Sequence, residues 1–234
     1  MTTPASHRVR EEWRARIAAE YTPAAITQHL VLWLIQAGAP PDLIEAGLVI
    51  VTDELVHSRM SHEVYVAAGG TQPPAIEREQ LGLARTAKVL ELDILRVAVR
   101  VFCLGETVAV PLFSHLREDC TQPEARAALD RILVDEVRHR DFGWDLLDWL
   151  LASPLGDDVP ALVATALPEM FAELHMTYGG GNDAVAADTG EMAPEDRAWG
   201  LAPPRDYARI LARCIEKDYR PRFAAREIAL PPSG

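Results

Sequence analysis

A five-residue pattern, an Asp-Glu pair followed two residues later by histidine, occurs twice in this chain and constrains it more than any other feature. The copies are residues 53–57 (DELVH) and 135–139 (DEVRH). On an α-helix, residues three apart lie on one face, so each copy directs one carboxylate and one imidazole to the same spot. One such pair is common by chance on a solvated helix. Two copies, each inside an apolar helical segment, indicate a shared metal-binding role.

The rest of the chain reads as nearly all helix, because alanine and leucine are abundant and alternating apolar patterns are scarce. A long loop is expected from Gly179 to about Pro204. Pro23 leaves two alternatives for the first helix: it continues with a kink, or a new helix begins at Pro23. Six helices are expected, over about residues 8–37, 42–68, 89–117, 124–151, 160–178 and 206–228.

The repeat extends to the helix that precedes each copy of the pattern. Aligning Glu20 with Glu106 also aligns His29 with His115, two histidines that we interpret as structural rather than metal-binding. Short links make each helix pair antiparallel, which brings Glu20 to the height of Glu54 and Glu106 to that of Glu136. The longer connection over residues 71–88 has room to return along the bundle.

These features predict a four-helix bundle of two antiparallel pairs joined by a crossover, over residues 1–152. Residues 153–234 are expected to form a helical extension packed on it. The bundle brings two carboxylate-histidine helices and two further glutamates together. The expected metal ligands are Glu20, Glu54, His57, Glu106, Glu136 and His139. Four buried carboxylates need two divalent cations to balance their charge.

Three further side chains are expected to support the ligands. Asp53 and Asp135 lie four residues before the two histidines and can accept the imidazole N–H that faces away from the metal. Arg138 can complete that network with the opposite aspartate. Carboxylate oxygens with one imidazole for each metal suit iron, with manganese or a mixed manganese-iron pair as the alternative.

Composition excludes several other classes. The net charge of -12 argues against nucleic acid and against an anionic membrane surface as partners. The charged start of the chain does not resemble a signal peptide, and we expect no membrane span. The three cysteines are far apart and form no C-x-x-C, which excludes a zinc ribbon and fits a reducing cytoplasm.

The doubled pattern, together with residues 19–20, 36–41 and 104–107, resembles the ferritin-like superfamily of dimetal-carboxylate proteins. That group includes bacterial multicomponent monooxygenases, ribonucleotide reductase small subunits and arylamine N-oxygenases. The resemblance covers about residues 8–152. It implies a ferritin-like fold and a dimetal site, usually di-iron, that activates dioxygen, but it does not fix a substrate.

The preferred hypothesis is a cytoplasmic oxidoreductase, an oxygenase or oxidase that uses O2 to hydroxylate, N-oxygenate or desaturate a small organic substrate. An electron donor protein is a possible partner, and a monomer or homodimer is expected. The alternatives are a ferroxidase or iron-handling protein, for which the proline-rich C-terminal third is poorly suited to cage assembly, and a structural helical module with a vestigial metal site.

Overall fold

The computed structural model describes residues 5–178 and 192–230, and within these stretches every regular element is a helix and none is a strand. The predicted all-α class is confirmed for this part of the chain. The glycine-rich opening of the predicted loop, residues 179–191, lies outside the described residues.

Backbone contacts divide the chain into two compact units, each made of separate segments. Unit 1 contains residues 1–85, 113–135 and 192–202, and unit 2 contains residues 86–112, 136–191 and 203–234. Two of the unit boundaries, after residues 112 and 135, fall inside helices that cover residues 107–118 and 123–151. The expected bundle of four helices and the division at residue 152 stay predictions.

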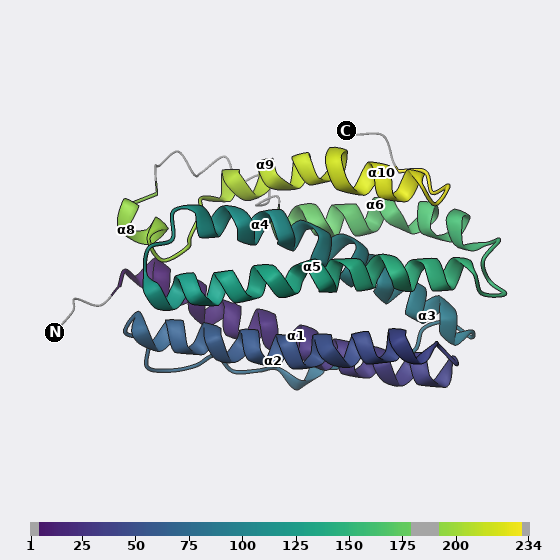
Figure 1. Cartoon of the computed structure of the whole chain (residues 1–234), viewed down its shortest axis with the longest axis horizontal. Coiled ribbons are helices and arrows are strands. Elements are labelled where there is room, and N and C mark those ends of the chain that lie inside the picture. Colours follow the sequence, from purple (N-terminus) through teal and green to yellow (C-terminus); the bar gives the residue numbers. More distant parts are fainter. Residues whose placement is uncertain (1–4, 179–191, 231–234) are drawn as a thin grey trace. The chain divides into compact units, whose positions relative to one another are not determined.

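Unit 1 is built on a hairpin of two long helices, α1 (His7–Gln36) and α2 (Pro41–Ala67), which lie side by side in Figure 1. The hydroxyl of Ser6 caps α1 by accepting a hydrogen bond from the Val9 N–H at 3.1 Å. After α1 the chain turns through Gly38 at a φ of 72°, where a side chain would be strained. The first antiparallel pair expected from the short link is therefore present.

Pro23 lies inside α1, which runs as one α-helix through it. The alternative in which a new helix begins at Pro23 is therefore wrong. A proline removes one hydrogen bond and crowds the carbonyl four residues earlier, here that of Ala19. Buried apolar residues on both sides, such as Trp13 and Leu30, offset that cost. Glu20 thus stays in register with the helix that continues beyond Pro23.

Unit 1 also contains a connection, a short helix and parts of two longer helices. The connection over residues 71–88 contains one short 3₁₀ helix, η1 (Arg78–Gln80). The short helix α8 (Pro194–Arg197) is followed by Trp199, whose carbonyl accepts a hydrogen bond from the Trp13 indole at 3.0 Å. The C-terminal part of α4 (Thr107–Glu118) and the N-terminal part of α5 (Pro123–Leu151) also belong to this unit.

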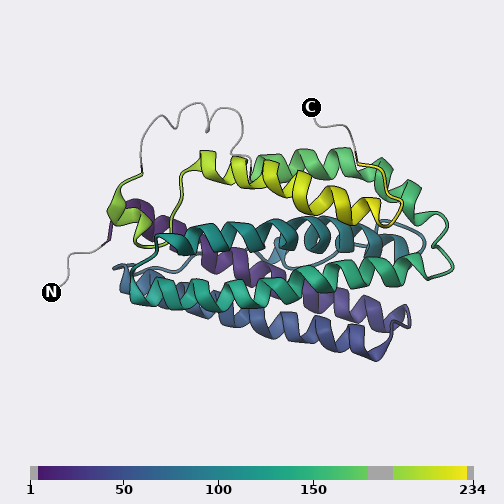
Figure 2. The same ribbon diagram turned by 45° about the horizontal axis from the view of Figure 1, so that its top comes forward.

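Unit 2 contains the remaining helices. Figures 1 and 2 show α6 (Val159–Tyr178) beside the C-terminal run from α9 (Pro204–Cys214) to α10 (Arg220–Ala224). The buried carboxylate of Asp93 holds the chain at the entry to this unit, because it accepts hydrogen bonds from the Thr86 and Ala87 N–H groups. Besides parts of α4 and α5, the helices are α3 (Leu90–Val97), η2 (Ala98–Glu106), α6 (Val159–Tyr178), α9 (Pro204–Cys214), η3 (Ile215–Tyr219) and α10 (Arg220–Ala224).

The helix expected over residues 89–117 is present but is not uniformly α-helical, which corrects the prediction. Its middle part, η2, is a π-helix, and a second π-helical segment, η3, follows α9. π-Helical turns are rare in proteins overall, and those that do occur often lie at functional sites. The last residue of η2 is Glu106, one of the predicted metal ligands.

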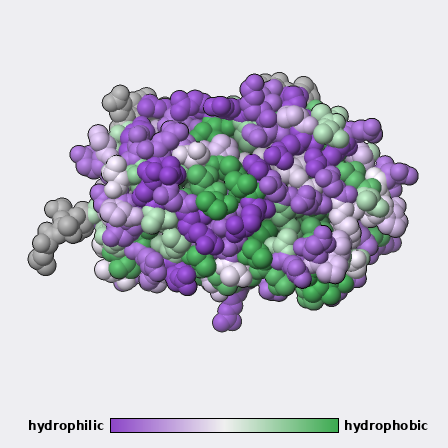
Figure 3. Space-filling model, in the orientation of Figure 1, coloured by the Kyte–Doolittle hydropathy of each residue, from purple (hydrophilic) through white to green (hydrophobic). Residues whose placement is uncertain are grey.

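Residues 90–118 are also long and apolar enough, by length and composition, to cross a membrane, but 56% of the apolar window is buried within the protein. A core helix of a soluble protein passes the same test, so the expectation of no membrane span stays a prediction. On the face drawn in Figure 3, hydrophobic residues form small patches among hydrophilic ones. Scattered exposed apolar side chains of this kind are normal for a folded protein.

Candidate metal centre

The first cluster of potential metal ligands lies in unit 1, where Glu20 of α1 meets Glu54 and His57 of α2. Their ligand atoms lie within 4.8 Å of one another, and all three residues are buried. The Nδ1 atom of His57 is 3.8 Å from a Glu20 carboxylate oxygen and 3.9 Å from a Glu54 carboxylate oxygen. Atoms that bind one ion at about 2.1 Å lie roughly 3–4 Å apart. This spacing fits a metal ion held by the three side chains, which we call triad 1.

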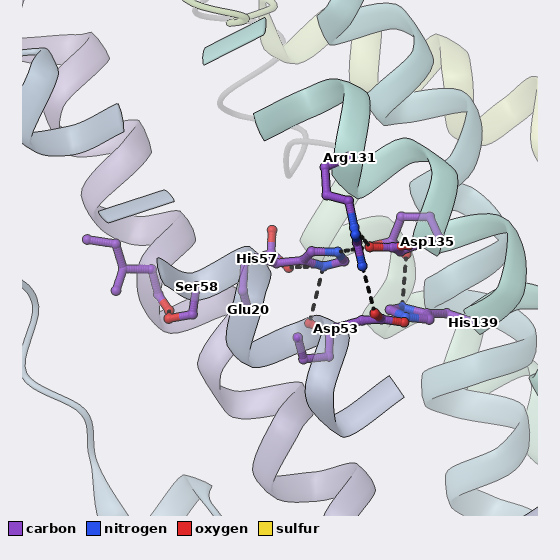
Figure 4. Close-up of polar contacts among 10 residues, drawn as sticks. Glu20, Asp53, His57, Ser58, Arg131, Asp135 and His139 are labelled. Carbon is purple, nitrogen blue, oxygen red and sulfur yellow. Dashed lines mark hydrogen bonds and ion pairs between the residues drawn. The ribbon is translucent and has the colours of Figure 1, made fainter. Parts of the chain in front are cut away.

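Asp135 fixes the orientation of the His57 ring. Its Oδ2 atom lies 3.0 Å from His57 Nε2, and Figure 4 shows the ring directed at this carboxylate. A proton on Nε2, donated to the carboxylate, leaves the Nδ1 lone pair pointing toward Glu20 and Glu54. A carboxylate behind the imidazole is the usual support of a metal-binding histidine. Asp135 therefore contacts the histidine of α2, and its predicted role behind a metal-binding imidazole stays a prediction.

An arginine that was not predicted, Arg131, contacts both aspartates, and the role expected for Arg138 stays a prediction. Arg131 Nη2 donates to Asp53 Oδ1 at 3.1 Å, and its Nε donates to Asp135 (Figure 4). Arg131 lies one turn before Asp135 on α5, within side-chain reach of its carboxylate. That i, i+4 spacing was the sequence signal that could have identified it.

Electrostatics keep the Asp135 carboxylate ionised. Burial alone would raise the pKa of Asp135, but hydrogen bonds from Arg131 and His57 outweigh it and hold the pKa below the ordinary value. The same pairing raises the pKa of the Arg131 guanidinium. The carboxylate is therefore a permanent acceptor for the imidazole N–H at neutral pH.

The second cluster lies in unit 2 and consists of Glu106, Glu136 and His139, which we call triad 2. Their ligand atoms also lie within 4.8 Å of one another. His139 Nδ1 is 3.8 Å from a Glu136 carboxylate oxygen, nearly the same spacing as between His57 and Glu54. Glu136 and His139 are 2% and 0% exposed, and Glu106 is 9% exposed. All six predicted ligands are thus buried, and each triad contains two glutamates and one histidine.

The segment around Glu106 is anchored on both sides by hydrogen bonds from within unit 2. The Tyr219 hydroxyl donates to the Leu104 carbonyl at 2.5 Å, and the Trp144 indole donates to the Thr107 hydroxyl at 3.0 Å. Neither Tyr219 nor Trp144 could be predicted to support Glu106 from the sequence, because neither residue belongs to the repeat. Their role depends on contacts between distant parts of the chain.

Close packing brings α5 against η2 in the same region. A Cβ atom on Gly143 would lie 2.5 Å from the Phe102 Cβ, so only glycine permits this approach. The Cys103 thiol donates to the Gly143 carbonyl at 3.2 Å, and the Phe102 ring meets Phe142 edge to face at 5.0 Å. The neighbours of Glu106 on its helix are therefore held in a tight apolar environment.

The two repeat-matched histidines, His29 and His115, contact other side chains or backbone groups, and their structural role stays an interpretation. His29 Nδ1 accepts a hydrogen bond from the Leu83 N–H at 3.0 Å, and its ring packs against the edge of Trp33. His115 Nδ1 lies 3.2 Å from a carboxylate oxygen of Glu118. Neither histidine belongs to the two triads.

A groove of about 410 Å³ lies in unit 2 between the α3–η2 helix and α6. Its apolar wall includes Val99 of η2 with Val163 and Met170 of α6. An ion pair at 2.9 Å between Arg100 and Glu173 lies at its exposed edge. The volume is within the range of small-molecule sites.

Comparison with known proteins identified no relative: no family model, no curated protein and no solved structure matches the chain. What the described residues establish is an all-helical protein with buried glutamate and histidine residues that could hold metal ions.

Proposed function

We propose that the two triads are halves of one dinuclear metal centre and that the protein is a non-haem di-iron oxidoreductase of ferritin-like type. The observation that carries this proposal is the repetition of one buried donor set. Glu54 with His57 and Glu136 with His139 have the same spacing in sequence and nearly the same separation in space, 3.9 and 3.8 Å. Each pair is completed by one glutamate from another helical segment.

The continuity of α5 supports a single centre. Asp135, which holds the imidazole of triad 1, is followed directly by Glu136 of triad 2 on one unbroken helix. Glu54 and His57 with Glu20 would hold one metal ion, and Glu136 and His139 with Glu106 would hold the other.

Charge balance favours two cations over one. The four glutamates carry four negative charges, and burying them without compensation would be prohibitive. Two divalent ions restore neutrality. Carboxylate oxygens with one imidazole for each metal suit iron, and manganese is the alternative. Bound as a pair, ferrous ions supply the electrons that activate dioxygen for oxidation of a small organic substrate.

The chain's own residues supply orientation and exclusion of water. Asp135 and Arg131 fix the His57 ring, so the imidazole does not reorganise when metal binds. Phe102 and Phe142 surround the segment that carries Glu106 with apolar surface, which keeps bulk water from the ligands. The groove beside Val99, on the helix that ends in Glu106, is the proposed substrate site.

Metal loading and oxygen uptake test the proposal. The metal-free chain is loaded anaerobically with Fe(II), bound iron is counted by elemental analysis, and oxygen uptake is followed with an electrode. We expect two irons for each chain and rapid oxygen uptake, both reduced in Glu136→Gln. The matched control is Glu124→Gln, which changes an exposed glutamate of the same helix. Wild-type chain that binds no iron, or binds it without oxygen uptake, would contradict the proposal.

Size-exclusion chromatography separates this proposal from iron storage, which the same ligands would serve. An oxidase is expected as a monomer or homodimer that does not retain ferric iron beyond the two bound ions. A shell of many copies filled with ferric iron would refute the oxidase assignment. The electron donor protein and the cytoplasmic location stay predictions.

The proposed substrate site has its own test. Ala166 of α6 lines the groove, and Ala166→Trp would fill much of its volume. We expect this variant to bind iron and take up oxygen like the wild type but to lose oxidation of any organic substrate found by screening. The control Ala161→Trp changes an exposed residue of α6 outside the groove lining. Unchanged substrate oxidation in Ala166→Trp would exclude the groove.

A further inference from the structure

We propose that Tyr219 is a positioning residue for Glu106: its hydroxyl holds the Leu104 carbonyl and thereby the π-helical turn that carries this ligand. The inference rests on the proposed function in that it takes Glu106 as a metal ligand. It assigns a role to the C-terminal segment, which the repeat does not contain. The juxtaposition of Tyr219, η2 and Glu106 lies wholly within unit 2.

Tyr219 is built into the structure as a fixed hydrogen-bond donor. The residue is completely buried, and its hydroxyl lies 2.5 Å from the Leu104 carbonyl oxygen. The phenol ring packs edge to face on Phe171 at 5.8 Å, and its hydroxyl also contacts the Cys214 thiol. A buried tyrosine requires a hydrogen-bond partner, and here that partner is a backbone carbonyl two residues before Glu106.

Leu104 lies two residues before the end of η2, where the π-helix gives way to α4. In an α-helix its carbonyl would accept the N–H four residues later, that of Val108. It accepts the N–H of Thr107, three residues later, at the end of the π-helical segment, so an interaction of shorter spacing is present here. The Tyr219 hydroxyl also donates to this carbonyl, so the Leu104 carbonyl has a hydrogen-bond partner outside its own helix.

Reversion of this turn to α-helical spacing would misdirect Glu106. Each residue of an α-helix turns the chain by about 100°, so removing the extra residue of a π-turn rotates the side chains beyond it by about that angle. A rotation of that size would turn the Glu106 carboxylate away from Glu136 and His139. The Tyr219 hydroxyl is thus the contact that makes the π-turn favourable over its α-helical alternative.

Titration with Co(II) tests this role, because the absorption spectrum of bound cobalt reports ligand geometry without any turnover. The wild type is expected to bind two Co(II). Tyr219→Phe should retain its fold by circular dichroism, yet bind one of the two ions about 10- to 100-fold more weakly. Its cobalt spectrum should change as in Glu106→Gln. The matched control is Tyr65→Phe, because the buried Tyr65 hydroxyl also donates to a backbone carbonyl, that of Gln72 at 3.0 Å.

Rescue by a different donor completes the test. Tyr219→4-aminophenylalanine keeps a para N–H donor and should restore the wild-type cobalt spectrum. If Tyr219→Phe fails to fold, this variant alone decides: wild-type binding supports the proposal and weakened binding of one ion overturns it. Wild-type affinity and spectrum in a folded Tyr219→Phe also overturn it. If the wild type binds no cobalt or iron, the proposed function itself fails, which is a distinguishable result.

Discussion

Replacing Asp135 by asparagine should weaken metal binding at triad 1 without removing a single metal ligand. Asp135 accepts hydrogen bonds from His57 Nε2 at 3.0 Å and from Arg131. Both donors share the Oδ2 atom of Asp135, and the neutral amide oxygen of asparagine is a weaker acceptor for them than an ionised carboxylate. If its amide N–H₂ faces the ring, it favours the tautomer with a proton on Nδ1, the atom nearest Glu20 and Glu54.

The expected magnitude follows from the partners lost. Removing the carboxylate behind a metal-binding histidine typically weakens metal affinity about 10- to 100-fold. That corresponds to about 1.4–2.7 kcal/mol in binding free energy. Arg131 is 48% exposed and can turn to water, so its lost pairing contributes little to the loss. The effect should therefore arise at the buried His57 ring.

Competition titration with a chromophoric chelator measures the two Co(II) affinities of Asp135→Asn. One affinity should fall and the other should stay, because triad 2 has its own ligands. The control is Asp130→Asn on the same helix, because hydrogen bonds from Arg117 and Arg126 likewise lower the pKa of Asp130, but on the surface. Equal affinities in Asp135→Asn, Asp130→Asn and wild type would refute the inferred orientation of His57.

In the metal-free protein, the effect of Asp135→Asn on folding stability should depend on pH. The pKa of Asp135 is lower in the folded than in the unfolded chain, so its contribution to stability is present above the unfolded pKa. That contribution is lost as the pH falls through the lower, folded pKa. The Asp135→Asn variant has no carboxylate at this position, so it should lose less stability than the wild type as the pH falls. Thermal unfolding of both chains between pH 6 and pH 3 should show their stabilities converging in acid.

Two further outcomes test the packing. Gly143→Ala should destabilise the chain by about 1–3 kcal/mol in urea unfolding, because the new Cβ would lie 2.5 Å from the Phe102 Cβ. Gly105→Ala, whose Cβ would meet nothing closer than 3.8 Å, should stabilise it by up to about 1 kcal/mol, and equal effects would contradict the inferred close approach. All three cysteines are buried. Burial raises the pKa of the Cys214 thiol to about 12. A chromogenic disulfide reagent at pH 8 should therefore label three thiols only after unfolding, and rapid labelling of the native chain would refute their burial.

Local sequence was sufficient to predict the helices and the buried donors. Proline and glycine mark most helix ends, so α1, α2, α5 and α6 begin and end within two residues of the expected positions. The ligands were recognisable because glutamate and histidine one turn apart are costly on an apolar face unless they bind something. Pro23 was the ambiguous position, and packing around α1 rather than local propensity decided it.

Long-range contacts explain what the sequence could not predict. Asp135 holds His57, a residue 78 positions away, and Tyr219 reaches Leu104 across 115 positions. The apolar stretch of η2 has no local signal that separates π-helical from α-helical turns. Arg131 lies outside the second copy of the pattern, and only the arrangement of the helices shows that it reaches Asp53 and Asp135.

The repeat therefore conserves the kind of ligand in each half, while the supports of the two halves differ. Glu20 lies on a regular α-helix, which Ser58 of α2 holds by donating to the Ile17 carbonyl at 2.9 Å. Glu106 lies at the end of a π-helical segment, which Tyr219 holds from a part of the chain outside the repeat. Each set of contacts lies within its own unit, so a loss in one should act mainly on its own triad. Asp135→Asn and Tyr219→Phe accordingly report on different metals, and weakening of the same ion by both would show that the halves are not separable in this way.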